Sequence, residues 1–413
     1  MHTAKARSRC PRAKGRMHVS SPCILYERGG ASVRPTDSEE AGKTKRWAAG
    51  LFFALIFLYN HVGVLSQGET SARAACVMEL HTGRVLFEAG MHDRLPMAST
   101  TKVMTALLAL ELGDLQSEVV CSENAFGVPG TSIYLTLGET LTLHDMLLGL
   151  MLASGNDAAV AIAEHIGGSA SQFVSLMNAR AQQIGALNTH FANPHGLPDD
   201  AHFTTAYDLT LIAREAMGNS AFRELVSTKT ATIPWAGRTS NRQLTNKNRL
   251  LTSYPGATGV KTGYTSRAGR CLVFGAQQGG MELIGVVLCC ADWFDEAERL
   301  LDACFADYSM VHVLGPTEPA GSIAVTGGRA EQADMCLMGE LSAPLREGES
   351  AQVVFDIPKS VEAPVYPGMH LGTAKLVVGG EVLGQCEVVA CERVDSRKLT
   401  MDVRRVMRGW MLP

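Results

Sequence analysis

The sequence predicts an α+β domain, an antiparallel sheet covered by an inserted helical cluster, followed by a small all-β domain. Three observations support this. Apolar, β-branched segments bounded by turn residues lie at both ends of residues 74–289, and helical patterns fill the interval between them. After Pro316 the chain changes to short alternating strands divided by glycine-containing turns. Strands at both ends of a helical run are typical of one sheet with helices segregated on it.

The first elements are a hairpin and a set of capped helices. Residues 74–89 form two short apolar strands around His81-Thr82-Gly83, which is a hairpin signal. A helix is expected from Thr100 to about Leu112, entered directly through Ser99. Three further helices are predicted by capping boxes, which pair Thr142 with Asp145, Ser169 with Gln172 and Thr205 with Asp208.

A second hairpin, residues 270–289, and a helix at about 294–307 complete this domain. The all-β domain is expected over residues 320–395. The chain then ends in Leu399–Leu412, where apolar side chains share one helical face and arginines fill the rest. Such a basic amphipathic helix is predicted to lie on an anionic membrane surface, and docking onto its own domain is the alternative.

The N-terminal region predicts export. Residues 1–46 carry eleven Lys or Arg and four Asp or Glu, so the rest of the chain has a net charge near −11 and does not suit nucleic acid. The uncharged run Trp47–Tyr59 has the length of a signal-peptide core, with cleavage expected after Ser66. An uncleaved anchor is the alternative. Either interpretation places the body of the protein outside the cytoplasm, because the positive flank stays inside.

Cysteine and histidine patterns predict neither a disulfide framework nor a metal site. The eleven cysteines show no regular spacing, so we interpret them as small buried side chains. The twelve histidines are scattered without ligand spacing, and no metal or other cofactor is expected. His195, between Pro194 and Gly196, is expected to order its loop rather than act as a base.

The candidate nucleophile is Ser99. Serine needs a base to remove its proton, and a lysine can serve when burial and nearby cations keep it neutral. Ser99 and Lys102 would share one helical face, and Lys102 alone among the lysines follows a serine at this spacing. At the helix N-terminus, free N–H groups would favour a developing oxyanion.

Two further motifs complete a candidate site. Ser154 and Asn156 lie in a polar break between two apolar helices, where they could present a hydroxyl and a carboxamide to a substrate. Lys261-Thr262-Gly263 opens an apolar strand, where Lys and Thr could hold a carboxylate and Gly would permit close approach of a substrate backbone. In this order the three motifs are the signature of penicillin-recognising serine enzymes.

Over about residues 72–412 the sequence resembles the low-molecular-weight penicillin-binding proteins, the peptidase S11 D-alanyl-D-alanine carboxypeptidases. The segments that carry the likeness include 96–111, 152–169, 191–209, 254–273 and 362–372. The resemblance implies a β-lactamase/transpeptidase-like catalytic domain at 67–315. It would follow an extension and signal segment at 1–66 and precede the β domain at 316–395 and the helix at 396–413.

The resemblance also implies roles for the site residues. Ser99 would attack the penultimate D-Ala of a peptidoglycan stem peptide, Lys102 would act as base and Ser154 would relay a proton. Asn156 would bind the substrate amide. The substrate carboxylate would contact Lys261 and Thr262, beside Gly263, and the backbone N–H groups of Ser99 and Tyr264 would bind the oxyanion. β-Lactams would acylate the same serine.

Two alternatives remain open at this stage. A serine β-lactamase shares the three motifs, but the Glu-x-x-Leu-Asn block that supplies its deacylating carboxylate is absent between residues 157 and 260. A catalytically silent wall-binding scaffold could keep the fold, but the reactive side chains are all present.

Overall fold

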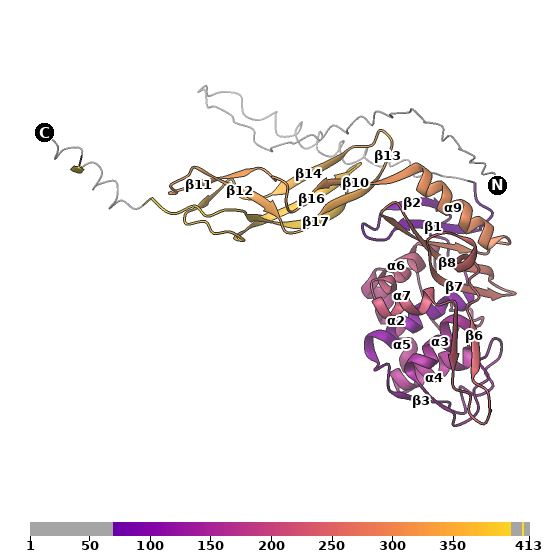
Figure 1. Ribbon diagram of the computed structural model, residues 1–413. Coiled ribbons are helices and arrows are strands. Elements are labelled where there is room, and N and C mark those ends of the chain that lie inside the picture. Colours follow the sequence, from indigo (N-terminus) through magenta and orange to yellow (C-terminus); the bar gives the residue numbers. More distant parts are fainter. Residues whose placement is uncertain (1–68, 398–406, 409–413) are drawn as a thin grey trace, which may run out of the picture.

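The computed structural model describes residues 69–397 and 407–408, and its first domain is built on a five-stranded antiparallel sheet in the order β2-β1-β9-β8-β7 (Figure 1). Both predicted hairpins are present in this sheet. The strands are β1 (Ala74–Glu79), β2 (Val85–Ala89), β7 (Ala257–Thr265), β8 (Gly269–Gln278) and β9 (Met281–Leu288).

Alternate side chains of the central strands enter two different cores. In β1, Ala74 and Cys76 pack into the core beneath the helical cluster. Ala75 and Val77 point to the opposite face, where Leu300 of α9 (Trp293–Asp307) covers them. Because both faces are buried, the strands are apolar throughout rather than alternating with polar residues.

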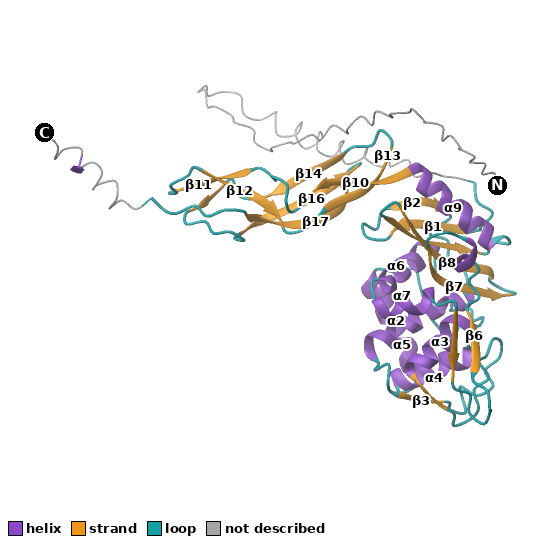
Figure 2. Cartoon of the chain, viewed as in Figure 1, coloured by secondary structure: helices purple, strands orange, loops and turns teal. Residues whose placement is uncertain are grey.

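The helical cluster lies between β2 and β7 in the chain and covers one face of the sheet, as Figure 2 shows. The side chains of Thr142, Ser169 and Thr205 each accept from the backbone N–H three residues on, so these residues are N-caps and the predicted helix starts are confirmed. The helices are η1 (Ala98–Thr101), α2 (Lys102–Leu112), α3 (Leu143–Leu148), η2 (Gly149–Ala153), α4 (Asn156–Gly167), α5 (Ala170–Ile184), α6 (Ala206–Met217), α7 (Ser220–Ser227) and α8 (Leu250–Ser253). Two small two-stranded sheets accompany them, one formed by β3 (Glu118–Val120) and β4 (Thr140–Thr142), the other by β5 (Thr230–Ile233) and β6 (Arg242–Thr245).

The second part of the chain is all β and extends away from the first domain (Figure 1). It contains a six-stranded sheet in the order β14-β16-β17-β12-β11-β15 and the pair β10-β13. Its strands are β10 (Tyr308–Leu314), β11 (Ser322–Thr326), β12 (Gln332–Leu337), β13 (Leu341–Arg346), β14 (Ala351–Asp356), β15 (Ser360–Glu362), β16 (His370–Val378) and β17 (Glu381–Ala390).

The strand β10 precedes residue 315, the predicted end of the catalytic domain, yet it pairs with β13. Its residues Val313 and Leu314 also belong to the core of the β region. The side chain of Arg84, from the β1–β2 hairpin, links the two parts through a 2.6 Å ion pair with Glu349.

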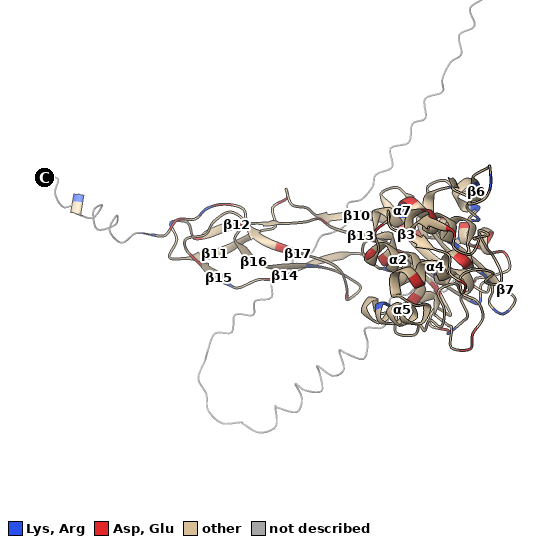
Figure 3. Ribbon diagram, turned by 90° about the horizontal axis from the view of Figure 1, so that it is seen from below, with Lys and Arg blue, Asp and Glu red and all other residues tan. Residues whose placement is uncertain are grey.

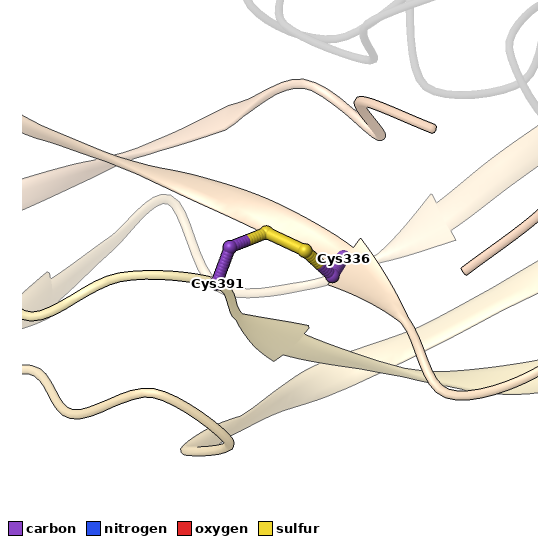
Figure 4. The surroundings of a disulfide bond; sticks show 2 residues. All are labelled: Cys336 and Cys391. Atoms are coloured by element: carbon purple, nitrogen blue, oxygen red, sulfur yellow. A yellow bond between two sulfur atoms is a disulfide. The ribbon is translucent and has the colours of Figure 1, made fainter. Parts of the chain in front are cut away.

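One disulfide joins Cys336 of β12 to Cys391, just after β17 (Figure 4). The expectation that the cysteines are small buried side chains is therefore wrong for these two. It is also wrong for Cys289, which is exposed, whereas Cys76, Cys121, Cys271, Cys290 and Cys304 are buried free thiols.

The predicted signal segment, Trp47–Tyr59, lies outside the described residues. So does the amphipathic segment Leu399–Leu412, apart from Met407 and Arg408, which are exposed. Among the described residues no helix is long and apolar enough to cross a membrane. Acidic and basic residues are interspersed over both parts of the described chain, as Figure 3 shows.

Candidate active site

Ser99 lies in the short 3₁₀ helix η1, immediately before α2, rather than directly at the start of the α-helix. Ala98, the first residue of η1, adopts a positive φ of 49°, so a regular α-helix cannot extend back through it. The Ala98 carbonyl accepts a 2.8 Å hydrogen bond from Thr101 Oγ1. It also lies against Gly196, where a Cβ atom would be only 1.9 Å from the oxygen. The backbone before the nucleophile is thus held from two sides.

Lys102 is fully buried and has three polar neighbours. Its Nζ lies 2.7 Å from Asn156 Oδ1, 2.7 Å from the His195 carbonyl oxygen and 3.1 Å from Ser99 Oγ. A neutral amine has two hydrogens and one lone pair. The two carbonyl oxygens can only accept, so they take the two hydrogens, and the lone pair is left facing the Ser99 hydroxyl.

The electrostatic surroundings favour the neutral form of this lysine. Burial, followed by the positive charges of Lys261 and Lys247, lowers the pKa of Lys102 well below its ordinary value of 10.5. Burial and Lys247 also lower the pKa of Lys261 to about 7. A buried cation beside other cations loses its proton readily, so Lys102 meets the requirement for a general base.

The predicted polar break between two helices is present and contributes to the same site. Ser154 ends the π-helical turn η2 in the left-handed conformation, at φ 65°, and is 3% exposed. Asn156 begins α4, where its Oδ1 binds Lys102 and its Nδ2 donates to the Pro129 carbonyl at 2.6 Å. The structure therefore brings Ser99, Lys102 and Asn156 together directly.

The third motif lies on β7, an edge strand of the sheet, in the second half of the strand rather than at its start as expected. Lys261 and Thr262 are 1% and 6% exposed. A Cβ atom at Gly263 would be 2.9 Å from Ser99 N, so only glycine lets β7 lie this close to the nucleophile. Tyr264 follows with a side chain 64% exposed.

The loop around residues 193–202 contacts the base through a backbone carbonyl, a role that the sequence did not predict. The His195 carbonyl binds Lys102, and the imidazole Nδ1 accepts from Leu197 N at 3.2 Å. Burial, then the charge of Lys102, lowers the pKa of His195 to about 3, so the ring is neutral and orders its own loop. His202 is neutral too, since burial lowers its pKa to about 4, and its Nε2 lies 2.7 Å from Thr101 Oγ1.

Two residues beside the site also escaped prediction. Lys247, which precedes α8, acts through its charge on both Lys102 and Lys261, and its backbone N–H contacts the Leu152 carbonyl in η2. Asp157, next to Asn156, is 1% exposed and binds backbone N–H groups of residues 133 and 135. Asp157 looks in sequence like an ordinary acid in a first helical turn.

Comparison with known proteins identifies relatives. Residues 62–291 match the family model of peptidase S11, D-alanyl-D-alanine carboxypeptidase. The chain is 33% identical to D-alanyl-D-alanine carboxypeptidase DacF of Bacillus subtilis over 352 residues, which cover 82% of this chain and 90% of that protein. It is 29% identical to DacC of Escherichia coli over 370 residues, 84% of this chain and 91% of that protein.

Solved structures are similar over both domains. The D-alanyl-D-alanine carboxypeptidase DacD from Francisella tularensis superimposes with a TM-score of 0.61 at 27% identity, covering 81% of this chain and 96% of that one. Penicillin-binding protein 5 from Haemophilus influenzae gives a TM-score of 0.67 at 25% identity, covering 80% and 99%. The predicted fold class, a transpeptidase-like domain followed by a β domain, is confirmed.

Proposed function

The chain belongs to the peptidase S11 family and is a serine-type D-alanyl-D-alanine carboxypeptidase, and from this premise we propose the roles of its site residues. Ser99 is the nucleophile and Lys102 is its general base. The observation that carries this proposal is the environment of Lys102 Nζ, whose two short contacts to carbonyl oxygens leave its lone pair for Ser99.

Acylation begins when Lys102 takes the Ser99 proton as Oγ attacks the carbonyl carbon of the penultimate D-Ala. The C–O bond forms, and the backbone N–H groups of Ser99 and Tyr264 stabilise the oxyanion. Protonated Lys102 returns this proton through the Ser154 hydroxyl to the leaving nitrogen as the C–N bond breaks, so the terminal D-Ala departs and Lys102 is again a free base. Water then attacks the acyl-enzyme carbonyl carbon and gives its proton to Lys102, which passes a proton to Ser99 Oγ as the ester C–O bond breaks.

Substrate binding falls to the other two motifs. Lys261 and Thr262 hold the terminal carboxylate. The Lys261 ammonium donates a charge-assisted hydrogen bond to it, and the Thr262 hydroxyl donates a neutral one. Asn156 uses one amide hydrogen on the Pro129 carbonyl, which leaves the second for a substrate carbonyl. The substrates are peptidoglycan stem peptides that end in D-Ala-D-Ala, and β-lactams acylate Ser99 as covalent inhibitors.

The predicted export supports this function because the substrate lies outside the cytoplasm. We propose that the mature enzyme acts at the outer face of the cytoplasmic membrane and associates with it through the C-terminal amphipathic helix. In Figure 1 the described β region ends far from the first domain, which suits an attachment point remote from the site. Flotation with anionic vesicles tests this: the full chain should bind, and a chain ending at residue 397 should not.

The decisive experiment is release of D-Ala from a pentapeptide ending in D-Ala-D-Ala. The wild-type enzyme should release D-Ala and be labelled by a fluorescent penicillin, and Ser99→Ala should do neither. Absence of release from folded wild-type protein would favour the scaffold alternative. Rapid turnover of a chromogenic β-lactam would favour the β-lactamase alternative.

A further inference from the structure

Asp157 has a cluster of contacts that the catalytic roles above do not use. Its carboxylate is 1% exposed in the first turn of α4. It accepts from Ser132 Oγ at 2.6 Å, from the backbone N–H groups of Ile133 and Leu135 at 3.1 Å and from Ala158 N at 2.9 Å. Both oxygens are therefore occupied by donors, and three of these donors belong to one loop segment.

That segment also shapes the surroundings of Asn156. The Asn156 backbone N–H donates to the Thr131 carbonyl at 2.7 Å, and its Nδ2 donates to the Pro129 carbonyl. A Cβ atom at Gly130 would be 2.8 Å from Asn156 Nδ2. The carboxamide is thus oriented by residues 129–131, whose continuation over residues 132–135 is held by Asp157.

We propose that Asp157 is the positioning residue of the base, acting through segment 129–135 on Asn156 and through Asn156 on Lys102. This inference rests on the proposed function of Lys102 as the base. The Asn156 carboxamide oxygen is one of the two acceptors that orient the Lys102 amine, so a rotated carboxamide turns the lone pair away from Ser99. Asp157 touches neither substrate nor nucleophile in this scheme.

The charge of Asp157 has a second effect on the base, on its pKa, which can be measured separately from the positioning effect. Among the groups that act on Lys102, Lys261 and Lys247 lower its pKa and Asp157 raises it. His195, also near Lys102, is neutral. On the other side Asp157 lies near Cys121, whose thiol pKa is raised to about 11 by burial and by Asp157, Glu139 and Glu164. Removing the negative charge should therefore lower the pKa of Lys102 further.

The chain offers a matched control in Asp208. This carboxylate is 2% exposed, lies in the first turn of α6 and accepts from Asn188 N and Thr189 Oγ1 at 2.6 and 2.9 Å. It holds a loop as Asp157 does, but its charge is not among those that shift Lys102. Asp208→Asn therefore measures what a buried loop-holding carboxylate contributes to stability alone.

The test measures the second-order rate constant of acylation by a fluorescent penicillin between pH 5 and 10, with thermal unfolding for each variant. Asp157→Asn should lower the rate constant between about ten- and a hundredfold at its optimum, and move the acidic limb of the profile to lower pH. Ser132→Ala keeps the charge and removes one contact, so it should lower the rate constant by less and leave the limb in place.

Asp208→Asn should lower the unfolding temperature without moving the limb. The inference is overturned if Asp157→Asn retains the wild-type rate constant, or if it changes only stability, as the control does. If Asp157→Asn does not fold, Ser132→Ala at the wild-type rate constant overturns it. Failure of the wild-type enzyme to be acylated would instead overturn the proposed function, so the two failures are distinguishable.

Discussion

Replacing Gly263 with alanine tests how closely β7 must approach the nucleophile. The new Cβ atom would lie 2.9 Å from Ser99 N, 3.0 Å from Thr100 N and 3.2 Å from Ala98 Cβ. The first contact is about 0.5 Å shorter than the 3.4 Å at which ordinary contact begins. Two of the three atoms are backbone nitrogens, which cannot rotate aside, so β7 and η1 must separate.

This separation acts on the reacting geometry because it moves the Ser99 N–H relative to the N–H of Tyr264. A displacement of 1 Å in an active site can cost about a hundredfold in rate, and loss of one oxyanion donor costs a similar factor. We expect a loss of between about ten- and a hundredfold in kcat/KM for D-Ala release, or about 1.4–2.7 kcal/mol of transition-state stabilisation.

The assay is D-Ala release across substrate concentration, together with the rate of penicillin acylation. Gly339→Ala is the matched control, since a Cβ there meets only Cys386 Cβ at 3.6 Å and its φ is not positive. The control should keep wild-type kinetics. Wild-type kcat/KM in Gly263→Ala would refute the reasoning, because β7 and η1 would then tolerate separation without loss.

Three further predictions concern charge and cross-linking. Lys247→Gln removes a charge that lowers the pKa of Lys102, so the acidic limb of penicillin acylation should move to higher pH; an unmoved limb contradicts this. Lys261→Met should abolish D-Ala release yet raise the unfolding temperature at pH 7. The pKa of Lys261 is about 7 in the folded protein and 10.5 ordinarily, so the unfolded chain holds the proton more tightly and the wild-type lysine costs stability below pH 10.5. The difference in unfolding temperature between variant and wild type should therefore shrink as the pH rises towards 10.5. Equal unfolding temperatures at pH 7 would contradict this. Replacing both Cys336 and Cys391 with serine opens a 55-residue loop and should cost about 4 kcal/mol in denaturant unfolding, and an unchanged midpoint would show that the bond adds nothing.

Much of the site could be predicted because the chemistry of its side chains, together with their spacing in the sequence, indicates their roles. The pairing of Ser99 with Lys102 follows from helical spacing, although Ser99 lies in η1, and the apolar residues around Lys261 indicate its place on a strand. The capping residues predict where the helices start because each side chain supplies an oxygen that accepts from a backbone N–H of the first helical turn. In each case the residue type performs the function that the pattern indicates.

The parts that escaped prediction depend on backbone atoms and on contacts distant in sequence. One acceptor for Lys102 is the carbonyl of His195, and any residue there would supply the same oxygen. The strand β10 follows the predicted helix in a stretch for which no strand was predicted, and its pairing with β13 assigns it to the β region. The disulfide could not be read from sequence because cysteine connectivity depends on tertiary proximity.

The three lysines of the site explain why its chemistry depends on burial. In water all of them would be charged at pH 7, and Lys102 could not act as a base. Burial lowers the pKa of Lys102 and of Lys261. The positive charges of Lys261 and Lys247 lower the pKa of Lys102 further, and the charge of Lys247 lowers that of Lys261. A substrate carboxylate at Lys261 would favour the charged form of that lysine, and this charge opposes protonation of Lys102. On the proposed function, the group that recognises the D-Ala carboxylate therefore also helps to keep the base beside Ser99 unprotonated.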